Sequence, residues 1–140
     1  MSTGERPLRL ADPMGPIEKK RVLVIDDEES FCTFVGLALE KTGRYKVASA
    51  TGPLQGVAMA GALRPDLILL DIKMPQMDGP QVAELLLEDA KTKSIPIVFI
   101  TGLVTNEETK HREMQVAGRT FIAKPVTRDE LVQAVGRILN

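Results

Sequence analysis

A run of four apolar residues that ends in an acid and a turn constrains the fold of this 140-residue chain most strongly. The run 67–70 is typical of a strand that is buried on both faces, as in the middle of a parallel sheet. Asp71 comes where this strand should end, and Pro75 with Asp78-Gly79 predicts a turn directly after it. Because open α/β sheets bind ligands beyond the carboxyl ends of their strands, we expect Asp71 to lie at a binding site.

Strand and helix patterns alternate along the rest of the chain. The segments predicted as strands are 21–25, 45–49, 67–71, 96–100 and 120–123. A helical pattern follows each of them, and the fourth of these helices is polar, begins at the capping box of Thr105 and Glu108 and ends at Gly118. This alternation predicts an α/β fold of the (βα)5 type, a doubly wound five-stranded parallel sheet with helices on both faces.

Composition and charge exclude several classes of protein. Apolar residues make up 44% of the chain and the formal net charge is -1, so no overall field favours nucleic acid or an anionic membrane. No apolar run approaches the roughly 18 residues that a membrane span needs. The single cysteine, Cys32, excludes an internal disulfide, and with no secretory signal pattern we expect a cytoplasmic protein. Prolines and glycines in residues 1–18 predict a flexible tail ahead of one domain over 19–140.

Polar residues follow four of the five predicted strands, where parallel strands share one edge. Asp26 and Asp27 follow the first strand, Asp71 ends the third, Thr101 ends the fourth, and Lys124 follows the fifth. Three carboxylates brought together repel one another unless a cation joins them, and Mg²⁺ accepts such oxygen ligands. With a lysine and a hydroxyl opposite, the set is suited to polarising a phosphoryl group while Asp71 attacks it.

Each residue of this set also has a purely structural explanation. An acidic pair after a strand commonly opens a helix, a threonine is common in strands, and a lysine is usually solvated. Two other functions stay open. An aspartate-nucleophile phosphatase or phosphotransferase would carry an Asp-x-Asp pair after its first strand, which Asp26-Asp27 does not match. A flavodoxin-like nucleotide binder would need a phosphate-binding loop there, and the first strand is followed by acids instead.

From Lys20 to its end, the chain resembles the receiver domain of two-component response regulators, of the single-domain type. The residues that carry this resemblance are Asp26-Asp27, the run from Asp71 through Lys73-Met74-Pro75 to Asp78-Gly79, Thr101-Gly102, and Phe121 ahead of Lys124-Pro125. The resemblance implies the strand order 2-1-3-4-5 of flavodoxin- and CheY-like folds. It also implies a cis peptide bond between Lys124 and Pro125.

The resemblance further implies a role for each residue of the site. Asp71 would be the phosphoacceptor, and Mg²⁺ would be bound by Asp27 and Asp71 directly, by Asp26 mostly through water, and by the backbone carbonyl of Lys73. The remaining implied roles concern the phosphoryl group and the switch: Thr101 and Lys124 would contact the phosphoryl oxygens, and Phe121 would swing inward as Thr101 moves.

A histidine kinase or a histidine phosphotransfer protein would be the donor, and the protein would be a phosphoacceptor rather than an enzyme. No output domain is visible after the last helix, so we expect partner binding, phosphoryl relay, or homodimerisation through the fourth helix, fifth strand and fifth helix. The chain could equally be a receiver cut from a larger regulator or hybrid kinase. Lys73 and Leu103 flank the site without an acid or amide, which predicts a long-lived aspartyl phosphate. His111 and Cys32 are expected to have no catalytic role.

Overall fold

A computed structural model describes residues 18–102, 113–116 and 119–140 of the protein. Its central feature is a sheet in which five strands run parallel in the order β2-β1-β3-β4-β6, which confirms the predicted 2-1-3-4-5 arrangement. These strands are β1 (Lys20–Ile25), β2 (Tyr45–Ala50), β3 (Leu67–Asp71), β4 (Ile97–Thr101) and β6 (Arg119–Ala123). β3 lies in the middle and is buried along its whole length, as its apolar run predicts.

One predicted helix is wrong where the structure describes it. The helix expected from Thr105 to Gly118 is contradicted by β5 (Glu113–Val116), a short strand that pairs antiparallel with the outer edge of β6. The backbone of β6 would otherwise present unpaired N–H and C=O groups at this edge, and β5 satisfies them. The capping box at Thr105 and Glu108 lies outside the described residues.

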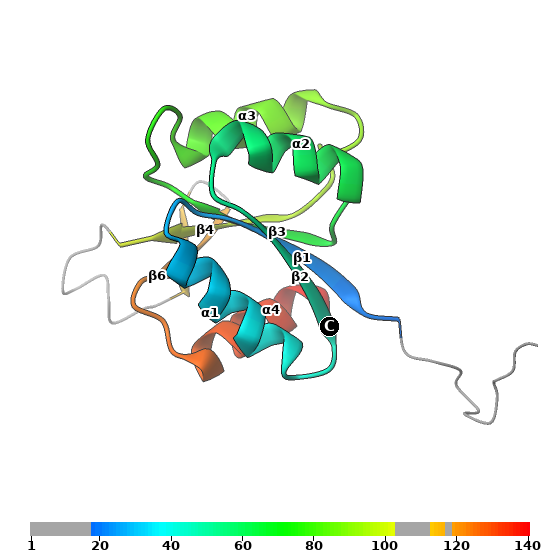
Figure 1. Ribbon diagram of the computed structural model, residues 1–140, viewed down its shortest axis with the longest axis vertical. Helices are drawn as coiled ribbons and strands as arrows, with labels where there is room; N and C mark the ends of the chain where they lie inside the picture. The colour runs from blue at the N-terminus through cyan, green and yellow to red at the C-terminus, as the bar shows by residue number, and fades with distance from the viewer. Residues whose placement is uncertain (1–17, 103–112, 117–118) are drawn as a thin grey trace, which may run out of the picture.

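In the described ranges, helices cover both faces of the sheet (Figure 1). α1 (Glu29–Glu40) lies beside α4 (Arg128–Leu139) on one face, and α2 (Pro53–Leu63) lies beside α3 (Gly79–Glu88) on the other. In the described ranges the longest helices have 12 residues, and none is long and apolar enough to cross a membrane. The fold therefore has three layers, with the sheet between two helical layers.

Each face of the sheet has its own apolar core, and β3 contributes to both. Leu67 and Leu69 pack on the face of α1 and α4, whereas Ile68 and Leu70 pack on the face of α2 and α3. This alternation follows from the two-residue period of a strand. Because both faces are covered, a polar side chain on a central strand can reach the sheet edge only at the end of the strand, and Asp71 is the last residue of β3.

Candidate functional site

Three carboxylates meet at the carboxyl edge of the sheet. β1 and β3 are parallel neighbours whose last pair is Ile25 with Leu70, so Asp26 and Asp71 come one step beyond it on each strand. One carboxylate oxygen from each of Asp26, Asp27 and Asp71 lies within 4.8 Å of the others. Asp26 is completely buried and Asp71 is 5% exposed, whereas Asp27 is exposed. The structure thus brings together the three acids that the sequence predicts at this edge.

The carboxylate of Asp26 is held by the start of α1. Its Oδ1 accepts a hydrogen bond of 2.8 Å from the backbone N–H of Glu28, and its own N–H donates to the carbonyl of Ala50 at 3.0 Å. Its buried Oδ2 receives no hydrogen bond of good geometry from the described groups, although Lys124 Nζ lies 2.9 Å away as an ion pair. A buried oxygen with spare acceptor capacity beside two further carboxylates fits the ligand set of a hard divalent cation.

Burial and neighbouring charge shift the titration of Asp71. Burial raises its pKa most, the negative charge of Asp26 raises it further, and Lys124 offsets part of the rise, while Asp27 adds to it through a hydrogen bond and its charge. The resulting pKa of Asp71 is about 7. The cluster therefore holds a proton near neutral pH, and a bound cation would take the place of that proton.

Lys124 follows β6 and lies against two carboxylates and a ring. Its Nζ is 2.9 Å from Asp26 Oδ2 and 2.6 Å from Glu28 Oε1, and it lies 4.4 Å from the centroid of the Phe31 ring. Burial alone would lower the pKa of Lys124, but its close contacts with the Asp26 and Glu28 carboxylates outweigh burial and raise the pKa above its ordinary value. Glu28 and Phe31 were missed by sequence reasoning, because spacing alone does not show which acid of the run 26–29 faces the lysine.

Thr101, Phe121 and Lys73 are the other residues predicted for the site. Thr101 ends β4 and is 6% exposed, and its carbonyl accepts a hydrogen bond of 2.7 Å from the N–H of Lys124. Phe121 is half-buried on β6, with its ring 5.5 Å from that of Phe99. The side chain of Lys73 is exposed in the loop after β3. The predicted roles of these three residues stay predictions, whereas the cis bond between Lys124 and Pro125 is present.

Cys32, predicted from the sequence to have no catalytic role, adjoins the backbone of the acidic cluster. Cys32 is buried on α1, where its thiol donates to the carbonyl of Asp26 at 3.4 Å. Its pKa is raised to about 11, first by burial and then by the charge of Asp26. Leu103 and His111 lie outside the described residues, so their predicted roles are untested.

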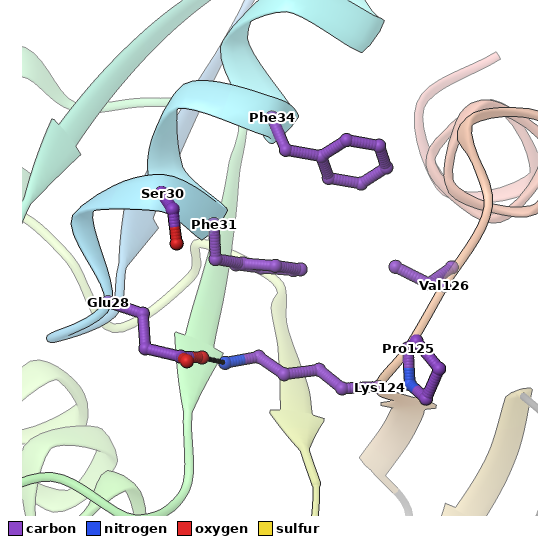
Figure 2. Close-up of a pocket in the computed structure, with 7 residues that line it drawn as sticks. All are labelled: Glu28, Ser30, Phe31, Phe34, Lys124, Pro125 and Val126. Carbon is purple, nitrogen blue, oxygen red and sulfur yellow. Dashed lines mark hydrogen bonds and ion pairs between the residues drawn. The ribbon is translucent and has the colours of Figure 1, made fainter.

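An open groove of about 460 Å³ runs beside the acidic cluster, between α1 and the segment that leads from β6 to α4 (Figure 2). Its lining consists of Glu28, Ser30, Phe31, Phe34, Lys124, Pro125 and Val126. Figure 2 shows the stem of Lys124 running along one side of the groove toward Glu28, with the rings of Phe31 and Phe34 facing Val126 across it. Lys124 therefore links the groove, which it lines, to the carboxylate cluster, where it pairs with Asp26.

Comparison with known proteins identifies the family to which this chain is similar. Residues 22–136 match the model of the response regulator receiver domain. Protein PilH of Pseudomonas aeruginosa is 32% identical over 120 residues, which cover 85% of this chain and 97% of PilH. The DNA-binding dual master transcriptional regulator RpaA of Synechocystis is 33% identical over 120 residues, and the chain spans about half its length (49%). The chemotaxis response regulator CheY4 of Vibrio cholerae superposes with a TM-score of 0.74 at 26% identity, over 87% of this chain and 100% of CheY4.

Proposed function

This chain belongs to the response regulator receiver family, and we propose that it is a phosphorylation-controlled switch in which Asp71 accepts the phosphoryl group. A receiver is a phosphoacceptor module rather than a conventional enzyme, and receivers work with histidine kinases. The donor would accordingly be a histidine kinase or a phosphotransfer protein. The observation that carries the proposal is the carboxylate cluster of Asp26, Asp27 and Asp71, closed on one side by the ammonium of Lys124.

In the proposed reaction, a carboxylate oxygen of Asp71 attacks the phosphorus atom of phosphohistidine. The new O–P bond forms as the P–N bond breaks, and the leaving imidazole retains the electron pair and takes up a proton. Lys124 and the Thr101 hydroxyl would then donate to the phosphoryl oxygens, which carry most of the charge.

The proposed metal is Mg²⁺, held by Asp27 and Asp71 directly, by Asp26 mostly through water, and by the backbone carbonyl of Lys73. When bound, it would offset the charge of the carboxylates and withdraw charge from the phosphoryl oxygens. The buried Asp26 oxygen without a well-aligned donor supports such a ligand set.

The proposed output is a change in partner binding or in homodimerisation. Thr101 and Lys124 are joined through their backbones, so a phosphoryl group that draws in both side chains would act on β4 and β6 together. Phe121, three residues before Lys124 on β6, would respond by moving inward. We further propose that residues 19–140 form the receiver domain, and that it works in the cytoplasm, either alone or as part of a larger regulator. The tail predicted for residues 1–18 lies, except for Glu18, outside the described residues.

Phosphorylation followed by intact mass measurement tests the proposal. The protein incubated with acetyl phosphate and Mg²⁺ should gain the mass of one phosphoryl group, and it should not gain this mass when excess EDTA is present during the incubation. Asp71→Asn should abolish the adduct, whereas Asp129→Asn, which removes an exposed carboxylate 84% accessible on α4, should not. Repeated turnover of phosphate esters would instead support the rival aspartate-nucleophile phosphatase, and an adduct on Asp71→Asn would refute the assignment of the acceptor.

A further inference from the structure

The ammonium of Lys124 forms ion pairs with two carboxylates that differ sharply in burial. Nζ lies 2.9 Å from Oδ2 of Asp26, whose side chain is completely buried, and 2.6 Å from Oε1 of Glu28, whose side chain is 60% exposed. The side chain of Lys124 is itself 17% exposed. The lysine therefore has an inner partner in the acidic cluster and an outer partner on the surface of the protein.

The outer contact draws Lys124 toward α1. Among the described residues, the salt bridges of Lys124 are those with Asp26 and Glu28, and Asp71 is not one of its ion-pair partners. The ammonium also lies 4.4 Å from the centroid of the Phe31 ring, a cation–π contact on the α1 side. Figure 2 shows the Lys124 side chain extended along the groove to the Glu28 carboxylate.

We propose that Glu28 is a positioning residue that holds Lys124 in a resting location, and that a phosphoryl group on Asp71 transfers Lys124 from Glu28 to a phosphoryl oxygen. This inference rests on the proposed function and adds to it the group that competes with the phosphoryl group for the lysine. The contact with Asp26 is kept through the transfer, and the contact with Glu28 is exchanged.

The burial of the two partners decides which contact is exchanged. Breaking the pair with the buried Asp26 would leave an uncompensated buried charge, which is costly, whereas Glu28 returns to water when it is released. A lysine ammonium has three donors on a flexible stem, so it can keep one partner while it replaces another. An exposed pair contributes up to about 1 kcal/mol, so holding Lys124 at Glu28 weakens phosphoryl binding by up to roughly fivefold.

The exchange also changes the groove at the surface. Glu28, Phe31 and Lys124 line the same groove, so the transfer leaves the Glu28 carboxylate at its rim without a cation. The Phe31 ring loses the ammonium that lies over it. The groove of the phosphorylated form is therefore more negative, and this difference is available to a partner at the surface.

The test is the affinity of the Mg²⁺-loaded protein for beryllofluoride, a stand-in for the phosphoryl group, measured by an NMR titration. Glu28→Gln should bind beryllofluoride about two- to fivefold more tightly than the wild type. Glu28 is the N-cap residue of α1 but makes no side-chain capping hydrogen bond, so this substitution removes no cap. The matched control is Glu29→Gln, which removes the neighbouring exposed charge in the first turn of α1, and it should change the affinity less than twofold.

Two further measurements separate positioning from a general effect of charge. In a Lys124→Ala background, Glu28→Gln should no longer increase the affinity, because the lysine on which Glu28 acts is gone. In the free protein, Glu28→Gln should move the ring resonances of Phe31 toward their positions in the wild-type beryllofluoride complex, and Glu29→Gln should not.

The outcomes distinguish this inference from the proposed function. Equal affinities for Glu28→Gln and Glu29→Gln, or an unchanged effect of Glu28→Gln in the Lys124→Ala background, would overturn the role of Glu28 while leaving Asp71 as the acceptor. If the wild-type protein binds no beryllofluoride and forms no adduct on Asp71, both the proposed function and this inference are refuted.

Discussion

Gly79 packs its α-carbon directly against the backbone of Asp71. A Cβ atom at position 79 would lie 2.6 Å from the Asp71 carbonyl oxygen and 2.9 Å from Cα of Ile72. The N–H of Gly79 also donates to the carbonyl of Ile72 at 2.7 Å. The loop between β3 and α3 therefore closes back on the strand that carries Asp71, and a glycine is needed where it closes.

Replacing this glycine should disturb the site through the backbone. We expect Gly79→Ala to destabilise the protein by about 1–3 kcal/mol, since the atoms that a Cβ meets are backbone atoms that cannot rotate away. Urea unfolding followed by circular dichroism measures this change. The control is Gly36→Ala within α1, where a Cβ meets nothing within 4 Å and the better helix propensity should stabilise by up to about 1 kcal/mol. A Gly79→Ala protein as stable as the wild type would contradict the close approach.

The raised pKa of Asp71 makes the stability of the metal-free protein depend on pH. The carboxyl titrates near 7 when folded and near 4 when unfolded, so the native state binds more protons between these values and loses stability as pH rises through them. The Asp71→Asn variant lacks this pH-dependent loss of stability. Its free energy of unfolding, relative to that of the wild type, should therefore increase by on the order of 2 kcal/mol from pH 5 to pH 8.

Denaturant unfolding in EDTA at several pH values measures the difference, and Asp129→Asn serves as the exposed control. At pH 8, Mg²⁺ should reduce the difference in free energy of unfolding between Asp71→Asn and the wild type, because a cation stabilises the ionised cluster. A difference that stays constant with pH would show that Asp71 is not the group that titrates.

Removing the charge of Lys124 should strengthen metal binding. Lys124 Nζ pairs with the carboxylate of Asp26, with which a divalent cation bound to the cluster would also interact. Lys124→Met leaves the cluster more negative and should therefore bind Mg²⁺ several-fold more tightly. Isothermal titration calorimetry measures the affinity. Lys46→Met, which removes an exposed cation on β2, is the control and should leave it nearly unchanged. Weaker Mg²⁺ binding by Lys124→Met would argue against competition for Asp26.

Cys32 should be unreactive in the folded protein. It is 5% exposed and its pKa is raised to about 11, so little thiolate is present at neutral pH and reagents reach it poorly. Labelling with a thiol-reactive disulfide reagent should be complete in urea and slow in buffer. Rapid labelling of the native protein would show that α1 opens at this position.

The aspartyl phosphate should be long-lived once formed. Lys73 lies two residues beyond Asp71 and offers no acid or amide to orient an attacking water. The purified phosphoprotein in Mg²⁺ should keep its added mass for minutes or longer, and Lys73→Glu should shorten this lifetime. Loss of the adduct within seconds in the wild type would contradict the prediction.

Features that depend only on short-range sequence pattern and on strand direction could be predicted correctly from the sequence. The apolar runs before Asp26 and Asp71 predict buried parallel strands, and parallel strands bring their carboxyl ends to one edge, so the acidic cluster follows without coordinates. Sequence reasoning failed for the helix expected up to Gly118, because the capping signal at Thr105 is local, whereas the strand at Glu113–Val116 forms by pairing with the edge of β6.

By itself, the sequence determined the alternating fold, the position of Asp71 at the end of the central strand, and the set of charges that meets there. Only the tertiary structure decided that Glu28 shares Lys124 with Asp26, and that the Phe31 ring lies beside the ammonium. The physical reason is that a strand's direction is encoded in a few neighbouring residues. The partner of a flexible lysine, in contrast, depends on where a helix 96 residues away along the chain places its first turn.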